Sequence, residues 1–187
     1  VSEPIQVYKM LPNPPSLVNK AKEKQVFSEL VGREQELERL QSRVERVISG
    51  EGAVVNLTGE AGIGKSRLIT ELKKQEVMKH VNLLHGRAIS MGENLSYYPI
   101  IDLLKRWAGI KREDSESSAL NKLKYAIAKL HPEEMEEILP FVATLMGIKL
   151  SSKYARRIKG IEGDALERLI VKNIRELAIK ACEQRPT

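Results

Sequence analysis

The sequence predicts an α/β fold, a parallel sheet flanked by helices, and three adjacent segments carry this prediction. Residues 53–58 form a short apolar run rich in β-branched side chains, which is typical of a buried strand. Residues 59–66 are rich in glycine, and residues 67–72 carry leucine and isoleucine at helical spacing. A strand that leads through a glycine loop into a helix is a building unit of such folds.

Residues 1–28 differ in composition from the rest of the chain. Residues 5–10 alternate apolar and polar side chains, as a short strand does. Residues 11–16 are rich in proline, which excludes a helix or a central strand there. We therefore expect residues 1–28 to be the end of a preceding domain and a linker, followed by a second domain over residues 29–187.

Helical patterns surround the glycine loop. Residues 34–49 place their leucine, valine and isoleucine side chains on one face, which predicts a helix before the strand. The helix after the loop is expected to reach about residue 79, and the apolar residues 81–85 predict a second strand.

The remaining residues predict helices. Proline suits the first turn of a helix but interrupts its interior, and a Ser, Thr or Asp followed three residues later by Glu marks a helix start. The expected elements are a helix opened by Pro99, one over residues 120–130, one opened by Pro132 that Pro140 kinks or ends, and one over residues 164–184 that begins with Asp164 and Glu167.

The glycine loop matches a phosphate-binding loop (P-loop) at every fixed position. Gly59 through Ser66 fit G-x-x-x-x-G-K-[ST]. Glycines let successive backbone N–H groups turn toward an anion, and the start of the following helix adds its positive dipole end. The residues predicted to contact the nucleotide are Gly59, Glu60, Ala61, Gly62, Ile63, Gly64, Lys65, Ser66 and Arg67.

Two side chains of the loop have predicted chemical roles. Lys65 would place an ammonium on the β- and γ-phosphates, which makes it the candidate catalytic residue. Ser66 would donate a hydroxyl ligand to Mg²⁺, so the predicted cofactors are ATP and Mg²⁺.

Guanine recognition usually needs Asn-Lys-x-Asp, and the nearest matches, residues 19–22 and 121–124, lack the acid. Adenine is therefore favoured over guanine.

Composition narrows the class of partner. The formal net charge is +6, and the densest basic group lies at residues 153–159 without a nucleic-acid-binding motif beside it. Nucleic acid is therefore not the expected partner. No apolar stretch approaches the length of a membrane helix. The sequence has a single cysteine, Cys182, which allows no internal disulfide. We expect Cys182 to be buried. A cytoplasmic domain is expected, and an oligomer is compatible with the sequence.

A second motif lies upstream of the loop. Leu30-Val31-Gly32-Arg33-Glu34, followed after about twenty residues by the loop, resembles the signal-transduction ATPases with numerous domains (STAND proteins), which are AAA-related regulatory NTPases. The resemblance covers roughly residues 29–187. It implies an ATP-binding regulatory domain of a multidomain signalling protein, with Val31, Gly32 and Arg33 on the adenine side of the nucleotide.

The resemblance leaves several functions open. Residues 2–8 are similar to the closing strand of class III adenylyl/guanylyl cyclase domains, which suggests a cyclase as the preceding domain. The domain could hydrolyse ATP in the intact protein. It could instead sense ATP or ADP without significant turnover and control an attached cyclase, or act as an ATP-dependent DNA-associated regulator.

A P-loop ATPase also needs an acid at the end of another strand to hold Mg²⁺. No apolar strand pattern after residue 88 ends in Asp or Glu. The resemblance implies that this Walker B strand follows a long helix such as residues 164–184. It also implies that the strands at 53–58 and 81–85 are not neighbours in the sheet. We therefore expect an incomplete domain in which these two strands lack partners.

Overall fold

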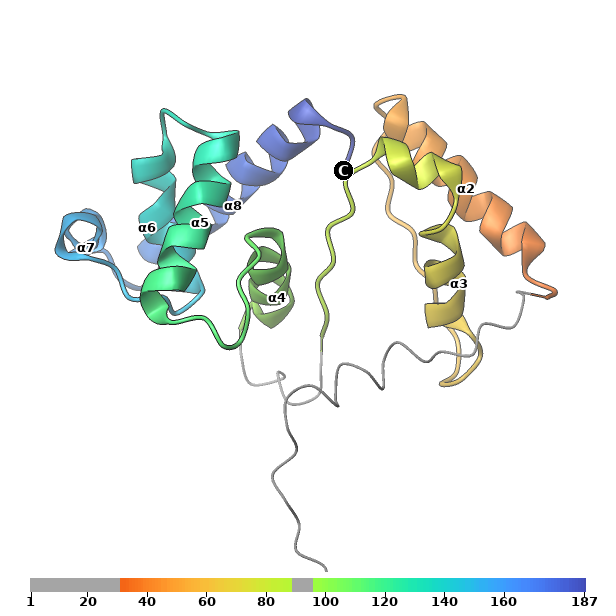
Figure 1. Ribbon diagram of the computed structural model, residues 1–187, viewed down its shortest axis with the longest axis horizontal. Coiled ribbons are helices and arrows are strands. Elements are labelled where there is room, and N and C mark those ends of the chain that lie inside the picture. Colours follow the sequence, from red (N-terminus) through yellow and green to blue (C-terminus); the bar gives the residue numbers. More distant parts are fainter. Residues whose placement is uncertain (1–30, 89–95) are drawn as a thin grey trace, which may run out of the picture.

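The computed structural model describes residues 31–88 and 96–187 (Figure 1). The predictions for residues 1–28, including the strand at 5–10 and the cyclase-like residues 2–8, lie outside the described residues. Figure 1 shows two groups of helices with the extended segment 81–88 passing between them.

The first group surrounds the glycine loop. It contains α2 (Glu34–Ile48), α3 (Lys65–Leu72) and the short 3-10 helix η1 (Glu76–His80), and α2 contacts both of the others. The predicted helix over residues 34–49 is confirmed. The helix after the loop is shorter than predicted, because Leu72 is its last buried residue and a turn follows.

The second group is a bundle built around α6. Its elements are α4 (Tyr98–Trp107), α5 (Glu116–Leu130), α6 (Met135–Leu145), α7 (Ser152–Ile158) and α8 (Gly163–Gln184). Helix α6 packs against α5, α7 and α8. The side chains that are almost fully buried here include Leu123, Ile127, Ile138, Leu139 and Val142. The main hydrophobic core of the described chain therefore lies in this bundle.

We expected the two predicted strands to lack partners, and in the described residues neither segment forms a strand. Within residues 31–88 and 96–187 the structure has no β-ladder, and segments 53–58 and 81–85 are extended without a strand beside them. Val54 is 94% exposed. A strand exists only with a hydrogen-bonded neighbour, so these segments keep the conformation of strands without forming a sheet. The described part of the predicted α/β fold is therefore helical.

Two helix-boundary predictions also differ from the structure. Helix α6 continues through Pro140, because losing one backbone hydrogen bond is offset by burial of the neighbouring Leu139 and Phe141. The capping box at the start of α8 does not form. Glu167 instead accepts a hydrogen bond from the Tyr97 hydroxyl, which joins α8 to the start of α4.

The basic residues of α7 are partly neutralised by α6. Lys153 pairs with Glu136, and Arg157 pairs with Glu137. Helix α7 itself was not predicted, since its seven residues carry too short an apolar pattern. Cys182 is exposed rather than buried, because it lies about 140° around α8 from the buried Leu177.

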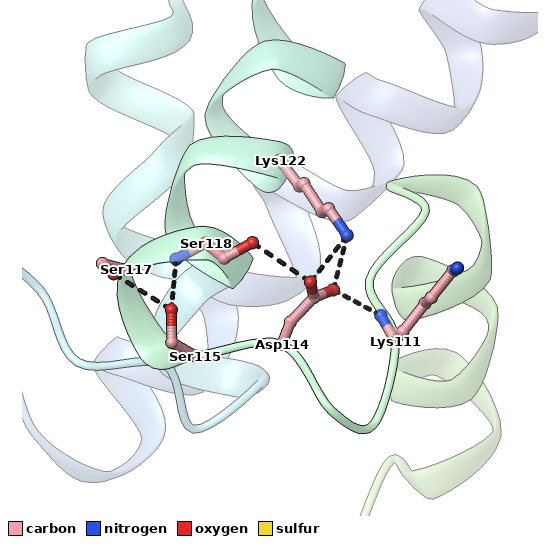
Figure 2. Close-up of polar contacts among 6 residues, drawn as sticks. All are labelled: Lys111, Asp114, Ser115, Ser117, Ser118 and Lys122. Carbon is pink, nitrogen blue, oxygen red and sulfur yellow. Dashed lines mark hydrogen bonds and ion pairs between the residues drawn. The ribbon is translucent and has the colours of Figure 1, made fainter.

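A carboxylate fixes the turn before α5 (Figure 2). Asp114 accepts hydrogen bonds from the Lys111 N–H at 2.7 Å, the Ser118 hydroxyl at 3.1 Å and the Lys122 ammonium at 2.6 Å. The bond from Lys122, followed by that from Lys111, lowers the pKa of Asp114 to about 2. The ionised side chain therefore holds the connection between α4 and α5.

This network predicts a pH-dependent effect of Asp114→Asn. The pKa of Asp114 is lower in the fold than its ordinary value of 3.8, so its contribution to stability is present above about pH 4 and is lost as the pH falls toward 2. The variant should melt at a lower temperature than the parent chain near neutral pH. The difference should shrink below about pH 4. A series of thermal melts checks this, and an equal difference at every pH would contradict the role of the charge.

Candidate phosphate-binding site

The glycine loop connects the extended segment 53–58 to the start of α3. Gly59, Gly62 and Gly64 have φ angles of 152°, 83° and 99°, and Gly64 is the N-cap of α3. These angles lie in the region that side-chain-bearing residues rarely adopt. The three glycines of the motif are therefore required by the backbone path of this loop.

The Lys65 side chain folds back over the loop. Its ammonium donates hydrogen bonds to the carbonyl oxygens of Gly59 at 2.8 Å and Glu60 at 2.7 Å. The lysine therefore closes the loop and keeps a positive charge beside its backbone.

Ser66 lies in the first turn of α3 and is exposed. Its backbone carbonyl accepts a hydrogen bond from the Thr70 hydroxyl at 2.8 Å, one turn later in the same helix. A hydroxyl at this position is accessible for a metal ion bound beside the phosphates.

The remaining loop residues offer mainly their backbones. Glu60, Ala61 and Ile63 are exposed, and an Ile63 methyl would lie 3.1 Å from a Cβ added to Gly59. Arg67 is half-buried and forms an ion pair with Glu71 at 3.5 Å. Its guanidinium therefore lies along α3 and is held by a partner on the same helix.

The upstream segment Val31 to Arg33 lies at the start of α2. Val31 is 83% exposed, the Gly32 N–H donates to the Glu34 carboxylate, and Arg33 pairs with Glu36 at 2.7 Å. These polar contacts are with α2 and not with the glycine loop. Helix α2 and segment 53–58 run in opposite directions, so both the start of α2 and the loop lie at the lower end of this group in Figure 1.

Sequence reasoning missed a carboxylate that joins segment 81–88 to α4. Asp102 accepts hydrogen bonds from the Arg87 N–H at 3.1 Å and from Arg106 at 2.9 Å, and the bond from Arg106 is the main cause of its lowered pKa. Gly86 also lies close to the backbone of α4, since a Cβ added to this residue would lie 2.4 Å from the Pro99 carbonyl oxygen. The spacing of Asp102 and Arg106 could have revealed their pair, but the contact with Arg87 joins residues fifteen apart.

Arg87 is therefore tied to α4 through Asp102. Burial is the main cause of the lowered pKa of His85 beside it, and the nearby cations Lys73 and Arg106 add to the effect.

Among residues 31–88 and 96–187, no group of three or more His, Cys, Asp or Glu residues could hold a metal ion. None of the helices in this part of the chain combines the length and apolarity needed to span a membrane.

Comparison with known protein families identifies the family to which this chain belongs. The model of the AAA ATPase domain family matches residues 29–187. The chain therefore belongs to this family of AAA-related P-loop NTPases, which indicates a nucleotide-binding ATPase domain.

One curated relative is an uncharacterized protein of Rhizobium meliloti (strain 1021). It is 35% identical over 75 residues, which make up 40% of this chain and 7% of that protein. The chain thus matches only a small part of this relative's length. No solved structure matches the chain.

Proposed function

We propose that residues 29–187 are the N-terminal part of an ATP-binding regulatory domain of the STAND type in a multidomain signalling protein. The observation that carries this proposal is the folded loop Gly59 to Ser66, with its three positive-φ glycines and the Lys65 ammonium held against its backbone. The upstream Val31-Gly32-Arg33 motif supports the STAND assignment.

In the proposed complex, the loop N–H groups and the start of α3 surround the phosphates of ATP. Lys65 leaves the carbonyl oxygens of Gly59 and Glu60 and moves its charge onto the β- and γ-phosphates. The Ser66 hydroxyl would hold Mg²⁺, which would neutralise phosphate charge. The backbone of Arg67 would lie beside the phosphates while its side chain stays paired with Glu71, and Val31 to Arg33 would border the adenine.

The proposed setting is a longer signalling protein. Residues 1–28 would end a preceding domain, for which the similarity of residues 2–8 supports a class III cyclase. ATP or ADP at the loop would then control the attached domain, with or without significant turnover. A DNA-associated regulator has less support, because Lys153 and Arg157 of the densest basic group already pair with glutamates of α6.

Titration calorimetry with ATP, ADP and GTP in the presence of Mg²⁺ tests the proposed ligand. We expect one molecule of ATP or ADP to bind per chain, more tightly than GTP. Phosphate release measured on the same samples separates binding from turnover. Absence of binding, or tighter binding of GTP, would contradict the assignment of adenine nucleotide.

A further inference from the structure

A pocket lies between the helical bundle and the extended segment 81–88. It has a volume of about 730 Å³, and its walls come from the end of α4, the second half of α5, the end of α8 and residues 82–84. The end of α8 meets the start of segment 81–88, where the Asn82 N–H donates to the Pro186 carbonyl oxygen at 2.7 Å (Figure 1). Ligand pockets commonly have volumes of roughly 300–1,000 Å³, so this pocket is large enough for a small molecule.

A smaller cavity adjoins this pocket. It has a volume of about 170 Å³, and all the side chains that line it are apolar or aromatic. Leu84, Trp107, Leu130 and Ala181 line both spaces, so the two spaces are contiguous. An apolar cavity of about 150 Å³ can hold a benzene molecule. The inner cavity therefore has room for an apolar group of the size of a phenyl ring.

The outer pocket carries positive charge without an acid beside it. Lys129 and Arg185 line the pocket, and none of the described Asp or Glu residues does. The Arg185 guanidinium is held by a hydrogen bond to the Lys79 carbonyl oxygen, which leaves its charge in place. In the described part of the chain, the Lys129 ammonium has no ion pair or hydrogen bond. These charges favour an anionic group in the ligand.

Two aromatic side chains line the same pocket. Trp107 is half-buried, and Tyr125 is 75% exposed. Across residues 31–88 and 96–187, neither the indole N–H of Trp107 nor the hydroxyl of Tyr125 makes a hydrogen bond. Aromatic rings pair favourably with another ring in stacked or edge-to-face arrangements. A ring in the ligand would therefore gain contacts here that a linear apolar chain would not.

We propose that this pocket binds a small aromatic acid, with its ring in the apolar inner cavity and its carboxylate beside Lys129 and Arg185. No residue of the glycine loop lines either space, so the inference is independent of the proposed nucleotide site. A nucleotide is the less suitable occupant. The nitrogen and oxygen atoms of its base would lose their hydrogen bonds to water on entering a cavity lined by apolar and aromatic side chains.

The fluorescence of Trp107 measures binding directly, because this residue is the single tryptophan of the chain. The probe is phenylbutyrate, and the matched compounds are its neutral amide, which lacks the charge, and butyrate, which lacks the ring. We expect phenylbutyrate to change the fluorescence saturably, with a dissociation constant of about 1 mM or lower. Both matched compounds should bind about tenfold or more weakly.

Substitutions of Lys129 test the positive charge. Lys129→Gln should weaken binding of phenylbutyrate about tenfold, while Lys129→Arg should retain most of it. The matched control is Lys124→Gln, because Lys124 is an exposed lysine of the same helix that does not line the pocket. This variant should leave the affinity unchanged.

Ala181→Leu tests the inner cavity. The larger side chain would occupy space that the ring needs, so binding of phenylbutyrate should weaken about tenfold or more. Far-UV circular dichroism verifies that the helices of the variant persist. The Lys129 substitutions, on an exposed side chain, test the site without changing the core.

Several results would overturn the inference. They are the absence of a saturable change in fluorescence with phenylbutyrate, equal affinity for its neutral amide, and wild-type affinity in a folded Lys129→Gln or Ala181→Leu variant. Displacement of phenylbutyrate by ATP from the Lys65→Ala variant would also overturn it, since the pocket would then take a nucleotide.

Discussion

Replacing Lys65 with alanine is expected to abolish measurable binding of ATP and ADP. The structure holds the ammonium against the loop backbone, through bonds to the carbonyl oxygens of Gly59 and Glu60. A hydrogen bond to a charged group contributes about 1.5–3 kcal/mol, so losing contacts with two phosphates should raise the dissociation constant by about 100-fold or more. Titration calorimetry or a fluorescent nucleotide measures this loss.

Lys79→Ala is the matched control for the Lys65 substitution. Lys79 is an exposed lysine of η1 that pairs with Glu76, outside the loop. Its replacement removes the same charge from the chain and should leave nucleotide affinity unchanged. Far-UV circular dichroism of both variants verifies that the helices persist. Wild-type affinity in a folded Lys65→Ala variant would contradict the proposed role of the lysine.

Ser66→Ala is expected to separate binding of the metal from binding of the nucleotide. If the hydroxyl is a ligand of Mg²⁺, its loss should weaken binding of Mg-ATP by about tenfold and change binding of metal-free ATP by no more than about twofold. The backbone N–H of residue 66 stays in place, so the contacts of the loop with phosphate should persist. Calorimetry with Mg²⁺ and with a chelator gives both affinities.

Ser66→Thr provides the internal control for the hydroxyl. Threonine also satisfies the last position of the P-loop motif, so this variant should keep the preference for Mg-ATP. An equal loss of affinity with and without Mg²⁺ in the alanine variant would instead assign Ser66 a role in the shape of the loop.

The sequence correctly predicted those elements that depend on residues close together in the chain. The apolar face of residues 34–49 predicted α2, and the fixed positions of Gly59 to Ser66 predicted a glycine loop that opens a helix. Pro99 lies in the first turn of α4, as expected from its missing N–H. Each of these signals depends on residues within one or two turns of each other.

Features that depend on distant partners were not predictable in the same way. Residues 53–58 have the composition of a strand, but pairing requires a neighbouring strand that no local pattern supplies. Pro140 was expected to interrupt α6, and only the burial of its neighbours explains why the helix continues. Glu167 had the spacing of a capping residue, yet it bonds to Tyr97 of another element.

The central claim is that the glycine loop binds a polyphosphate, and amide NMR of glycine-labelled chain tests it most directly. The account predicts that adding ADP, or pyrophosphate alone, shifts the resonances of Gly59, Gly62 and Gly64. Gly109 and Gly147, which also have positive φ angles but lie in the helical bundle, should stay in place. Unmoved loop glycines, or equal shifts at all five positions, would contradict the claim.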